Sequence, residues 1–395
     1  MSDTLKADRP AIRPETRAMI ERLIAFDTTS RNSNLELIHY VRDYLADLGV
    51  EASLVHDAAG RKANLYATLG PGDRPGIALS GHTDVVPIDD QDWHRDPWQV
   101  SEHDARLYGR GTSDMKSFIA VALAHAPRFL ESELQTPIHL CFSYDEEVGC
   151  KGVPRLLDFL ASQPVKPAMC IVGEPTEMKV ITGHKGKKSM CCHVRGKEAH
   201  SSLAPYGVNA VNAAARVVGF LADMAARKAE EGPFDDDFDV PYTTVHTGTI
   251  EGGTQLNIVP GHCRFEFEFR YLPQDDPDAL LAEVQRYAEQ QLAPAMQSID
   301  PASGFTWEQI SGFPGLNLSP GAEVIELAKA LSGGNDTGKV AFGTEAGLFD
   351  QSGIPAVVCG PGSIDQAHKP DEFVSKEQLS ACLDMLAGLQ RKLAG

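Results

Sequence analysis

The chain has little that would suit it to nucleic acid or to membranes. Its 36 lysines and arginines are outnumbered by 55 aspartates and glutamates, a formal net charge of −19. That excess disfavours nucleic acid or an anionic membrane surface as a partner. No apolar run reaches the ~18 residues of a bilayer span, and residues 1–10 lack the apolar segment of a secretory signal. We therefore expect a cytoplasmic protein with no nucleic-acid and no membrane partner.

The eight cysteines include no C-x-x-C pair, and the sequence has no internal repeat or low-complexity tract. Most of these cysteines lie inside apolar runs, which is typical of buried free thiols in a reducing compartment. We predict neither disulfides nor a thiolate-ligated zinc site. The 42% hydrophobic and 23% charged residues are typical of a globular protein.

Helical periods and short apolar runs alternate over residues 1–182, which predicts an α/β domain around a largely parallel sheet with helices on both faces. The expected helices cover 14–26, 34–48, 115–130 and 152–160, and the expected strands 51–56, 63–69, 76–80, 137–144 and 168–172. The same rhythm resumes over 313–395, with helices over 322–331 and 376–393 and strands over 339–342 and 354–359. This domain is therefore expected to be interrupted.

The interrupting segment, 183–312, has a different order of elements. Strands are expected over 187–194, 243–250, 263–271 and 305–310, and helices over 209–227 and 278–292. The order β-α-β-β-α-β is that of a ferredoxin-like unit. The predicted fold is therefore a mixed-sheet α/β domain that carries an inserted ferredoxin-like α+β domain.

Candidate metal ligands cluster where strands end. Ser80-Gly-His-Thr-Asp-Val-Val-Pro87 follows an apolar run, so His82 and Asp84 should lie at a strand's carboxyl end, where open α/β sheets place their sites. Two residues apart, they project to one side of an extended backbone. A carboxylate beside an imidazole fixes its tautomer and orients it, so we expect Asp84 to orient His82. An isolated H-x-D pair is usually ordinary loop chemistry.

Further carboxylates and a second histidine occupy similar positions: Asp114, Glu146, Glu147, Glu174 and His368. Singly, each has an ordinary explanation, such as a helix N-cap for Asp114. Together, two histidines and several carboxylates at one sheet edge suit Zn²⁺, Mn²⁺ or Co²⁺. There are more ligands than one tetrahedral ion needs, which predicts a two-metal site. In the adjacent pair Glu146–Glu147, one residue would ligate and the other act as general base.

The motifs S-G-H-T-D-V-V-P, G-R-G-T-S-D-M-K, D-E-E-V-G, G-E-P-T and A-H-K-P-D-E resemble those of the M20 family of dinuclear metallohydrolases, over nearly the whole chain. The resemblance implies that Asp114 bridges two divalent ions, zinc first, with cobalt or manganese as alternatives. His82 and Glu174 would complete one ion's site, and Glu147 and His368 the other's. Glu146 would be the general base, and a cis peptide would follow Asp114.

The resemblance also implies that the inserted domain forms a homodimer. His200, in Gly196-Lys-Glu-Ala-His-Ser-Ser202, would then reach the partner's site and stabilise the oxyanion. By the same resemblance, Arg270 would bind the substrate's α-carboxylate, with Asn257 beside it. These roles describe a hydrolase for small N-acyl amino acids.

Within the family, Gly343-Thr-Glu-Ala346 and residues 360–372 are most similar to the acetylornithine deacetylases of arginine biosynthesis. That similarity implies hydrolysis of N-acetyl-L-ornithine to L-ornithine and acetate, with Glu345 meeting the distal ammonium. The alternatives are a succinyl-diaminopimelate desuccinylase, a broader aminoacylase or dipeptidase, and a catalytically silent binding protein. The presence of Glu146 argues against a binding protein, because such a protein would need no general base.

Overall fold

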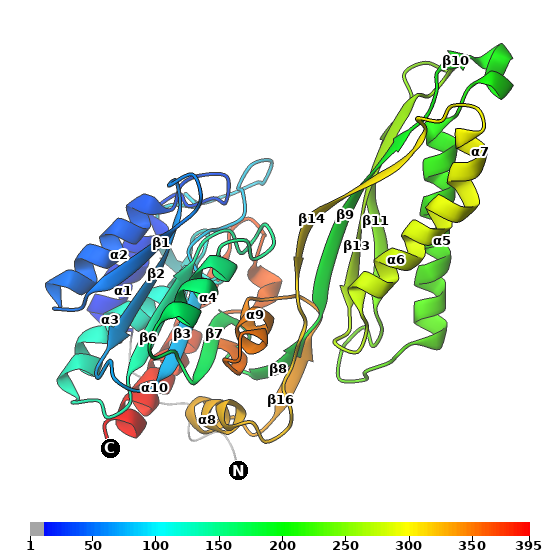
Figure 1. Ribbon diagram of the computed structural model, residues 1–395. Helices are drawn as coiled ribbons and strands as arrows, with labels where there is room; N and C mark the ends of the chain where they lie inside the picture. Colours follow the sequence, from blue (N-terminus) through cyan, green and yellow to red (C-terminus); the bar gives the residue numbers. More distant parts are fainter. Residues whose placement is uncertain (1–11) are drawn as a thin grey trace. The chain divides into compact units, whose positions relative to one another are not determined.

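The computed structural model describes residues 12–395 (Figure 1), so the expectation for residues 1–10 lies outside the described part. The chain divides into two compact units. The first contains the described residues up to Gly183 together with Asn317–Lys339 and Thr344–Gly395. The second contains His184–Leu316 and Val340–Gly343, where the sequence placed an inserted domain over 183–312.

The main sheet of the first unit is mixed, with strand order β1-β2-β6-β3-β7-β17-β8-β15 and β16 beside β8. Its strands are β1 (Ala52–His56), β2 (Ala63–Leu69), β3 (Ile77–His82), β6 (Ile138–Ser143), β7 (Met169–Pro175), β8 (Val180–His184), β15 (Leu316–Asn317), β16 (Thr337–Val340) and β17 (Ala356–Gly360). β6, β3, β7 and β17 are mutually parallel, whereas β1 and β2 are antiparallel additions. The carboxyl ends of the four parallel strands therefore meet at one edge.

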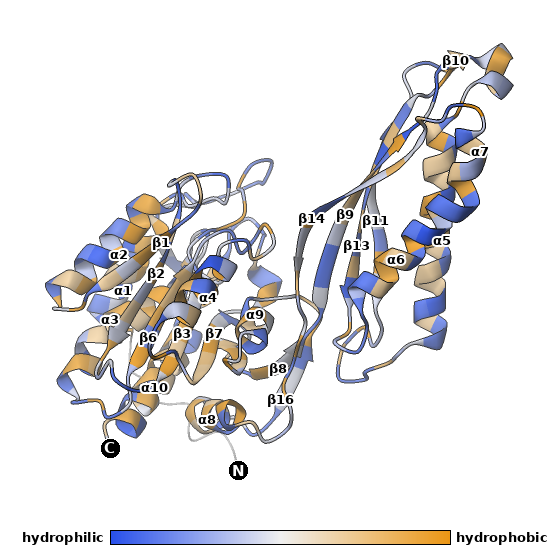
Figure 2. Cartoon of the chain, in the orientation of Figure 1, coloured by the Kyte–Doolittle hydropathy of each residue, from blue (hydrophilic) through white to orange (hydrophobic). Residues whose placement is uncertain are grey.

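Helices cover both faces of this sheet, as the sequence predicted. One face carries α1 (Pro14–Ile24), α2 (Leu35–Asp47), α3 (Lys116–Glu131), α8 (Glu323–Ser332) and α10 (Lys376–Leu393); the other carries α4 (Val153–Ser162) and α9 (Ala346–Gln351). α3 is buried along most of its length because α1, α10 and the sheet surround it. Strands β3, β6 and β7 are mainly hydrophobic (Figure 2), as expected of strands covered on both faces.

A small three-stranded sheet was not predicted. It contains β4 (Ser101–His103), β5 (Arg106–Tyr108) and β18 (Phe373–Ser375), in the order β18-β5-β4. Each strand has three residues, too few for a period of two to be recognised. The pairing of Phe373 with Tyr108 joins the segment after His368 to the segment before Asp114.

The second unit has the predicted ferredoxin-like topology. Its elements are β9 (Gly186–Arg195), α5 (Ala210–Glu231), β11 (Thr244–Gly252), β13 (His262–Tyr271), α6 (Pro277–Tyr287), η2 (Ala288–Leu292), α7 (Ala293–Gln297) and β14 (Gly304–Phe313). The antiparallel sheet order is β11-β13-β9-β14. Of these four strands, β13 is the third in the sequence, and it lies between the first, β9, and the second, β11. The single helix expected over 278–292 is instead α6 followed by a π-helical turn before Pro294.

Burial alternates along β13 and shows which face of the sheet packs against the core of this unit. Its odd-numbered residues from Cys263 to Tyr271 are buried, whereas Arg264, Glu266, Glu268 and Arg270 are only partly buried. α5 and α6 pack over the buried face, and the other face of the sheet is polar. β10 (Ala199–His200) and β12 (Ile258–Val259) form a separate two-stranded ladder next to the short helix η1 (Ser201–Tyr206).

All eight cysteines are buried free thiols, which confirms the prediction from their sequence context. Among the described residues, no helix combines the length and the hydropathy that crossing a bilayer requires.

Candidate metal centre

The predicted ligands of the first unit converge at the carboxyl edge of the main sheet. His82 ends β3, Glu146 and Glu147 follow β6, and Glu174 lies near the end of β7. Asp114 occupies the turn before α3, and His368 lies in the loop after β17, next to η3 (Ile364–Gln366). Ligand atoms of His82, Asp114 and Glu147 lie within 4.8 Å of one another, and so do those of His82, Glu146 and Glu174.

Asp114 lies between the two histidines. Its Oδ1 is 2.9 Å from His82 Nε2, and its Oδ2 is 3.4 Å from His368 Nε2. His82 Nε2 also lies 3.5 Å from Glu174 Oε1, and His368 Nε2 lies 3.0 Å from Glu147 Oε2. The two oxygens of the Asp114 carboxylate thus face different histidines, each with its own glutamate neighbour. The expected cis peptide between Asp114 and Met115 is present.

The concentration of carboxylates shifts the pKa values of the whole cluster. Burial, followed by the charge of Asp114, raises the pKa of Glu147 and of Glu174 to about 7. Burial and Glu174 raise the pKa of Glu146. Hydrogen bonds with Asp114 and Glu147 raise the pKa of His368 to about 10. Without other cations, protons must compensate this negative charge, and divalent ions would do so more directly.

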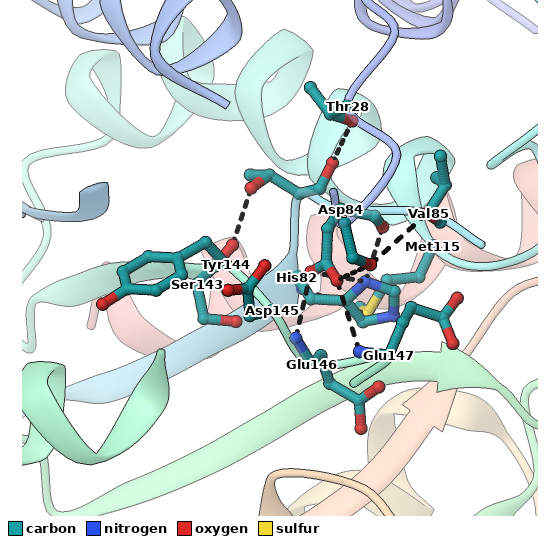
Figure 3. A network of polar contacts seen from close by, with 12 residues as sticks. Thr28, His82, Asp84, Val85, Met115, Ser143, Tyr144, Asp145, Glu146 and Glu147 are labelled. Carbon is teal, nitrogen blue, oxygen red and sulfur yellow. Dashed lines mark hydrogen bonds and ion pairs between the residues drawn. The ribbon is translucent and has the colours of Figure 1, made fainter. Parts of the chain in front are cut away.

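Asp84 does not orient His82 in the way the sequence suggested. The His82 Nδ1 atom is 2.9 Å from the backbone oxygen of Asp84 and 3.7 Å from its carboxylate. The backbone carbonyl therefore fixes the tautomer and leaves Nε2 free to ligate. The Asp84 carboxylate instead accepts the backbone N–H groups of Glu146 (3.1 Å) and Glu147 (3.3 Å). Figure 3 shows Asp84 between the strand end at His82 and this turn.

Two further contacts hold the Glu146–Glu147 turn. Ser30 Oγ donates to Asp84 Oδ2 at 2.7 Å, and Lys62 forms an ion pair with Asp145. The Cys150 thiol, which is buried, lies 3.3 Å from Glu146 Oε1. No role for Ser30 or Cys150 was predicted from the sequence. Only the position of Cys150 four residues after Glu146 could have suggested its contact.

Glu345 lies in the interior rather than at an open substrate pocket. Its side chain is 1% exposed, and its carboxylate accepts hydrogen bonds from Ser143 and, at 3.4 Å, from Ser80. Burial raises its pKa to about 7. The expectation that Glu345 meets a substrate ammonium is therefore corrected, because its oxygens are enclosed and already have hydrogen-bond donors.

His200 and Asn257 are neighbours in the second unit. His200 pairs with Ile258 across the β10–β12 ladder, and Ser201 N donates to Asn257 O at 2.9 Å. The backbone N–H of Ser202 donates to His200 Nδ1 at 3.2 Å. The neutral imidazole therefore carries its proton on Nε2, and the exposed side chain can donate that proton to another group.

Arg270 lies far from that pair, which corrects the expectation that Asn257 is beside it. β13 begins at His262, opposite Arg195 and close to the β10–β12 ladder, and Arg270 is near its other end. Eight residues of strand separate the two positions, roughly 27 Å at about 3.4 Å per residue. The Arg270 guanidinium is 2.9 Å from Glu268.

The donors in the first unit fit divalent metal ions. Two imidazoles and a set of buried carboxylates supply nitrogen and oxygen, no thiolate takes part, and one carboxylate faces both histidines. Such donors suit Zn²⁺, Mn²⁺ or Co²⁺, and a shared carboxylate is usual when two ions lie side by side.

Known proteins that resemble this chain in sequence belong to a family of hydrolases. Residues 78–392 match the model of peptidase family M20/M25/M40. The chain is 36% identical to an acetylornithine deacetylase from Myxococcus xanthus, over 98% of this chain and 97% of that protein. It is 32% identical to another from Pasteurella multocida, over 95% and 97%.

Solved structures share the fold. An M20 family metallo-carboxypeptidase from Sulfolobus solfataricus superposes with a TM-score of 0.74 at 19% identity, over 97% of this chain and 99% of that one. An aminopeptidase from Bacillus cereus gives 0.71 at 20% identity, over 96% and 98%.

Proposed function

Because the chain belongs to peptidase family M20/M25/M40, we propose that it removes the acetyl group from N-acetyl-L-ornithine, giving L-ornithine and acetate. The family and the relatives identify a metal-dependent amidohydrolase. Relatives that are 32–36% identical over nearly the whole chain and are named acetylornithine deacetylase support this choice of substrate.

The arrangement around Asp114 carries the proposal. Its two oxygens face His82 and His368 separately, and Glu174 and Glu147 flank those histidines. We assign His82, Asp114 and Glu174 to one ion, and Asp114, Glu147 and His368 to the other. Zinc suits this donor set best, with cobalt or manganese as alternatives.

Glu146 is the proposed general base. When bound, divalent ions supply Lewis acidity for the acyl carbonyl and lower the pKa of water to ~7. Glu146 takes the proton of the attacking water and then returns it to the leaving amine. Two features of this chain suit that task. Asp84 fixes the backbone of the turn, and burial raises the pKa of the Glu146 carboxyl, so it can hold a proton between the two steps.

His200 and Asn257 are assigned to the partner's site in a homodimer. The exposed Nε2–H of His200 can donate to the oxyanion, whose charge develops only in the transition state. Large apolar side chains close to this pair in the sequence face solvent: Leu203 is 52%, Tyr206 71% and Leu256 101% exposed. Clusters of this kind mark protein contacts, and a second copy of the chain is the proposed occupant.

Arg270 is the proposed partner of the substrate's α-carboxylate. Its side chain is 33% exposed and is paired with Glu268, so a substrate carboxylate would share the guanidinium with that residue. Arg270 and His200 lie near opposite ends of the second unit's sheet. Glu345 is proposed to support the strand ends through Ser80 and Ser143 rather than to bind substrate.

The proposed cellular role is ornithine production in arginine biosynthesis, in the cytoplasm. The eight buried free thiols suit a reducing compartment. Expression of the chain in a strain that cannot deacetylate N-acetylornithine should restore growth without added ornithine. The Glu146→Gln variant, expressed to the same level, should not restore it.

The decisive test of the reaction compares three substrates under one metal condition. N-acetyl-L-ornithine should have a higher kcat/KM than N-succinyl-LL-diaminopimelate or N-acetyl-L-methionine. The enzyme reconstituted with zinc and the Glu146→Gln variant should be measured in parallel. A faster succinyl substrate would make the protein a desuccinylase, and faster acetyl-methionine would make it a broader aminoacylase.

A further inference from the structure

Glu372 is a fully buried carboxylate at the edge of the metal centre that is not among the proposed ligands. It lies four residues after His368 and immediately before β18, and it is 1% exposed. Its Oε1 atom accepts the backbone N–H groups of Ser113 at 2.7 Å, Asp114 at 3.0 Å and Gly111 at 3.1 Å. One side chain thus binds most of the backbone donors in the turn that presents Asp114.

Arg110 completes the enclosure of this carboxylate. Its Nη1 donates to Glu372 Oε2 at 2.7 Å, and both side chains are 1% exposed. Nη2 donates to Gln91 Oε1 at 2.6 Å, and the guanidinium lies 4.9 Å from the centre of the Trp93 ring. A buried pair with this many hydrogen bonds has a defined geometry, because any displacement would leave a buried charge without its partner.

The same group of residues holds the loop of His368. Gln91 Nε2 donates to the backbone oxygen of His368 at 2.9 Å, and Arg110 Nη1 approaches that of Lys369 at 3.3 Å. His368 itself has φ of 62° and a side chain that is 54% exposed. Because His368 lies outside any helix or strand, these contacts hold the backbone that carries its imidazole.

Asp114 and His368 are therefore joined by a connection that does not pass through a metal ion. Their side chains approach to 3.4 Å, although 254 residues separate them in the sequence. Glu372 binds the Asp114 amide directly, and it lies on the segment that follows His368. A change in Glu372 would move the bridging carboxylate and this histidine relative to each other.

We propose that Glu372, held by Arg110, which in turn binds Gln91, is a positioning residue that sets the spacing between Asp114 and His368 and so the affinity for the ion they share. This inference rests on the proposed metal site. Residues that orient metal ligands without touching the ion typically change metal affinity or activity about 10- to 100-fold when they are replaced. The ion assigned to His82 and Glu174 should be affected less, because Glu372 forms no hydrogen bond or ion pair with either residue.

The test uses Glu372→Gln, which keeps the size of the side chain and replaces one acceptor oxygen by an NH₂ donor. That donor would face either Arg110 or the backbone N–H groups of the turn. Zinc and cobalt affinities are measured by chelator competition on metal-free protein, and cobalt absorption reports the geometry of each ion. We expect the affinity for the ion assigned to Asp114, Glu147 and His368 to fall about 10- to 100-fold and the cobalt spectrum of that ion to change.

Metal rescue separates positioning from general damage. Excess metal should restore most of the kcat of Glu372→Gln, because mass action refills a weakened site, but it should not restore Glu146→Gln. Asp365→Asn is the matched control, since this acidic residue is exposed on the same loop. Its two metal affinities should equal those of the wild type.

The outcomes distinguish this inference from the proposed function. Wild-type protein that binds no divalent ion would overturn the metal site itself. Wild type with two ions and a folded Glu372→Gln with both affinities unchanged would overturn the positioning role alone. If Glu372→Gln does not fold, Gln91→Ala decides, because Gln91 is only partly buried. This substitution removes the hydrogen bond to the backbone oxygen of His368. An unchanged affinity for the ion assigned to Asp114, Glu147 and His368 would equally overturn the positioning role.

Discussion

The carboxyl edge of the main sheet and the β10–β12 ladder of the second unit differ in how their polar side chains are held. At the sheet edge, the proposed ligands contact one another and most are buried. Around the β10–β12 ladder, His200 and Asn257 are exposed, and so are the apolar side chains beside them. The first region has its binding groups arranged within one chain. The second presents the Nε2–H of His200, which has no hydrogen-bond acceptor within the described residues.

This difference has a physical origin. Buried carboxylates repel one another, so the sheet edge needs cations and a fixed backbone to hold them. Asp84 and Glu372 provide the fixed backbone by binding the turns of Glu146 and Asp114. An exposed imidazole needs no such compensation. It gains strength as a donor only when another surface removes it from water. We therefore expect replacements at the two regions to affect different steps.

The largest effect is expected at the general base. Glu146→Gln should retain both metal ions and lose about 10²- to 10⁴-fold in kcat, because the amide keeps the shape of the side chain but cannot carry the proton. Steady-state kinetics and metal analysis of the same sample check this. Glu177→Gln, an exposed glutamate after β7, is the control and should resemble the wild type. Nearly full activity in Glu146→Gln would place the base elsewhere.

The next largest effect is expected at His200. His200→Ala should lose about 10²- to 10³-fold in kcat, the usual effect of removing one oxyanion donor, with metal content unchanged. Mixing it with Glu146→Gln under subunit exchange should recover activity, since each mixed dimer contains one site with both groups. Confirmed mixed dimers without recovery would show that both residues serve one chain's site.

A smaller effect is expected at Arg270, and it should appear in KM. Arg270→Met should raise KM about 10- to 100-fold with little change in kcat, as expected for loss of one hydrogen bond between charged groups. Arg264→Met is the matched control, because Arg264 lies on the same face of β13 and pairs with Glu266. An equal rise in KM in both variants would mean that the sheet's charge, rather than Arg270, attracts the substrate.

The affinity of the metal sites for divalent ions should depend on pH, because protons bound to the ligands compete with the metal. Without metal, the pKa of His368 is raised to about 10 by Asp114 and Glu147, so its imidazole is protonated at pH 8. A metal ion must displace that proton. Apparent affinity should therefore rise about tenfold per pH unit for each displaced proton. Calorimetry in buffers of different ionisation enthalpy counts the protons, and none released at pH 8 would contradict this.

The smallest change in selectivity is expected from Glu345→Gln. Because Glu345 is buried against Ser80 and Ser143, the activities towards N-acetyl-L-ornithine and N-acetyl-L-methionine should fall together. Their ratio of kcat/KM should stay within about threefold of the wild-type ratio, since no contact specific to one substrate is lost. A clear loss confined to acetylornithine would restore Glu345 as a partner of the ammonium.

The sequence by itself indicated the α/β layout, the ferredoxin-like order of the insertion and the free thiols. These depend on periodicity and composition, which are local properties of the chain. It also pointed to His82, Asp114, Glu147, Glu174 and His368, because parallel strands bring their carboxyl ends to one edge. We propose all five as ligands of the two ions.

Only the tertiary structure decided which groups these residues contact. Two residues apart in sequence, His82 and Asp84 suggested a side-chain pair, but the strand end turns the carboxylate of Asp84 towards the Glu146 turn. Glu345 was expected to face substrate and is enclosed by two strands. Glu372 gave no local signal, because its hydrogen-bond donors lie 258 to 262 residues earlier in the chain. Contacts across such distances depend on how the strands and loops pack, which local patterns do not encode.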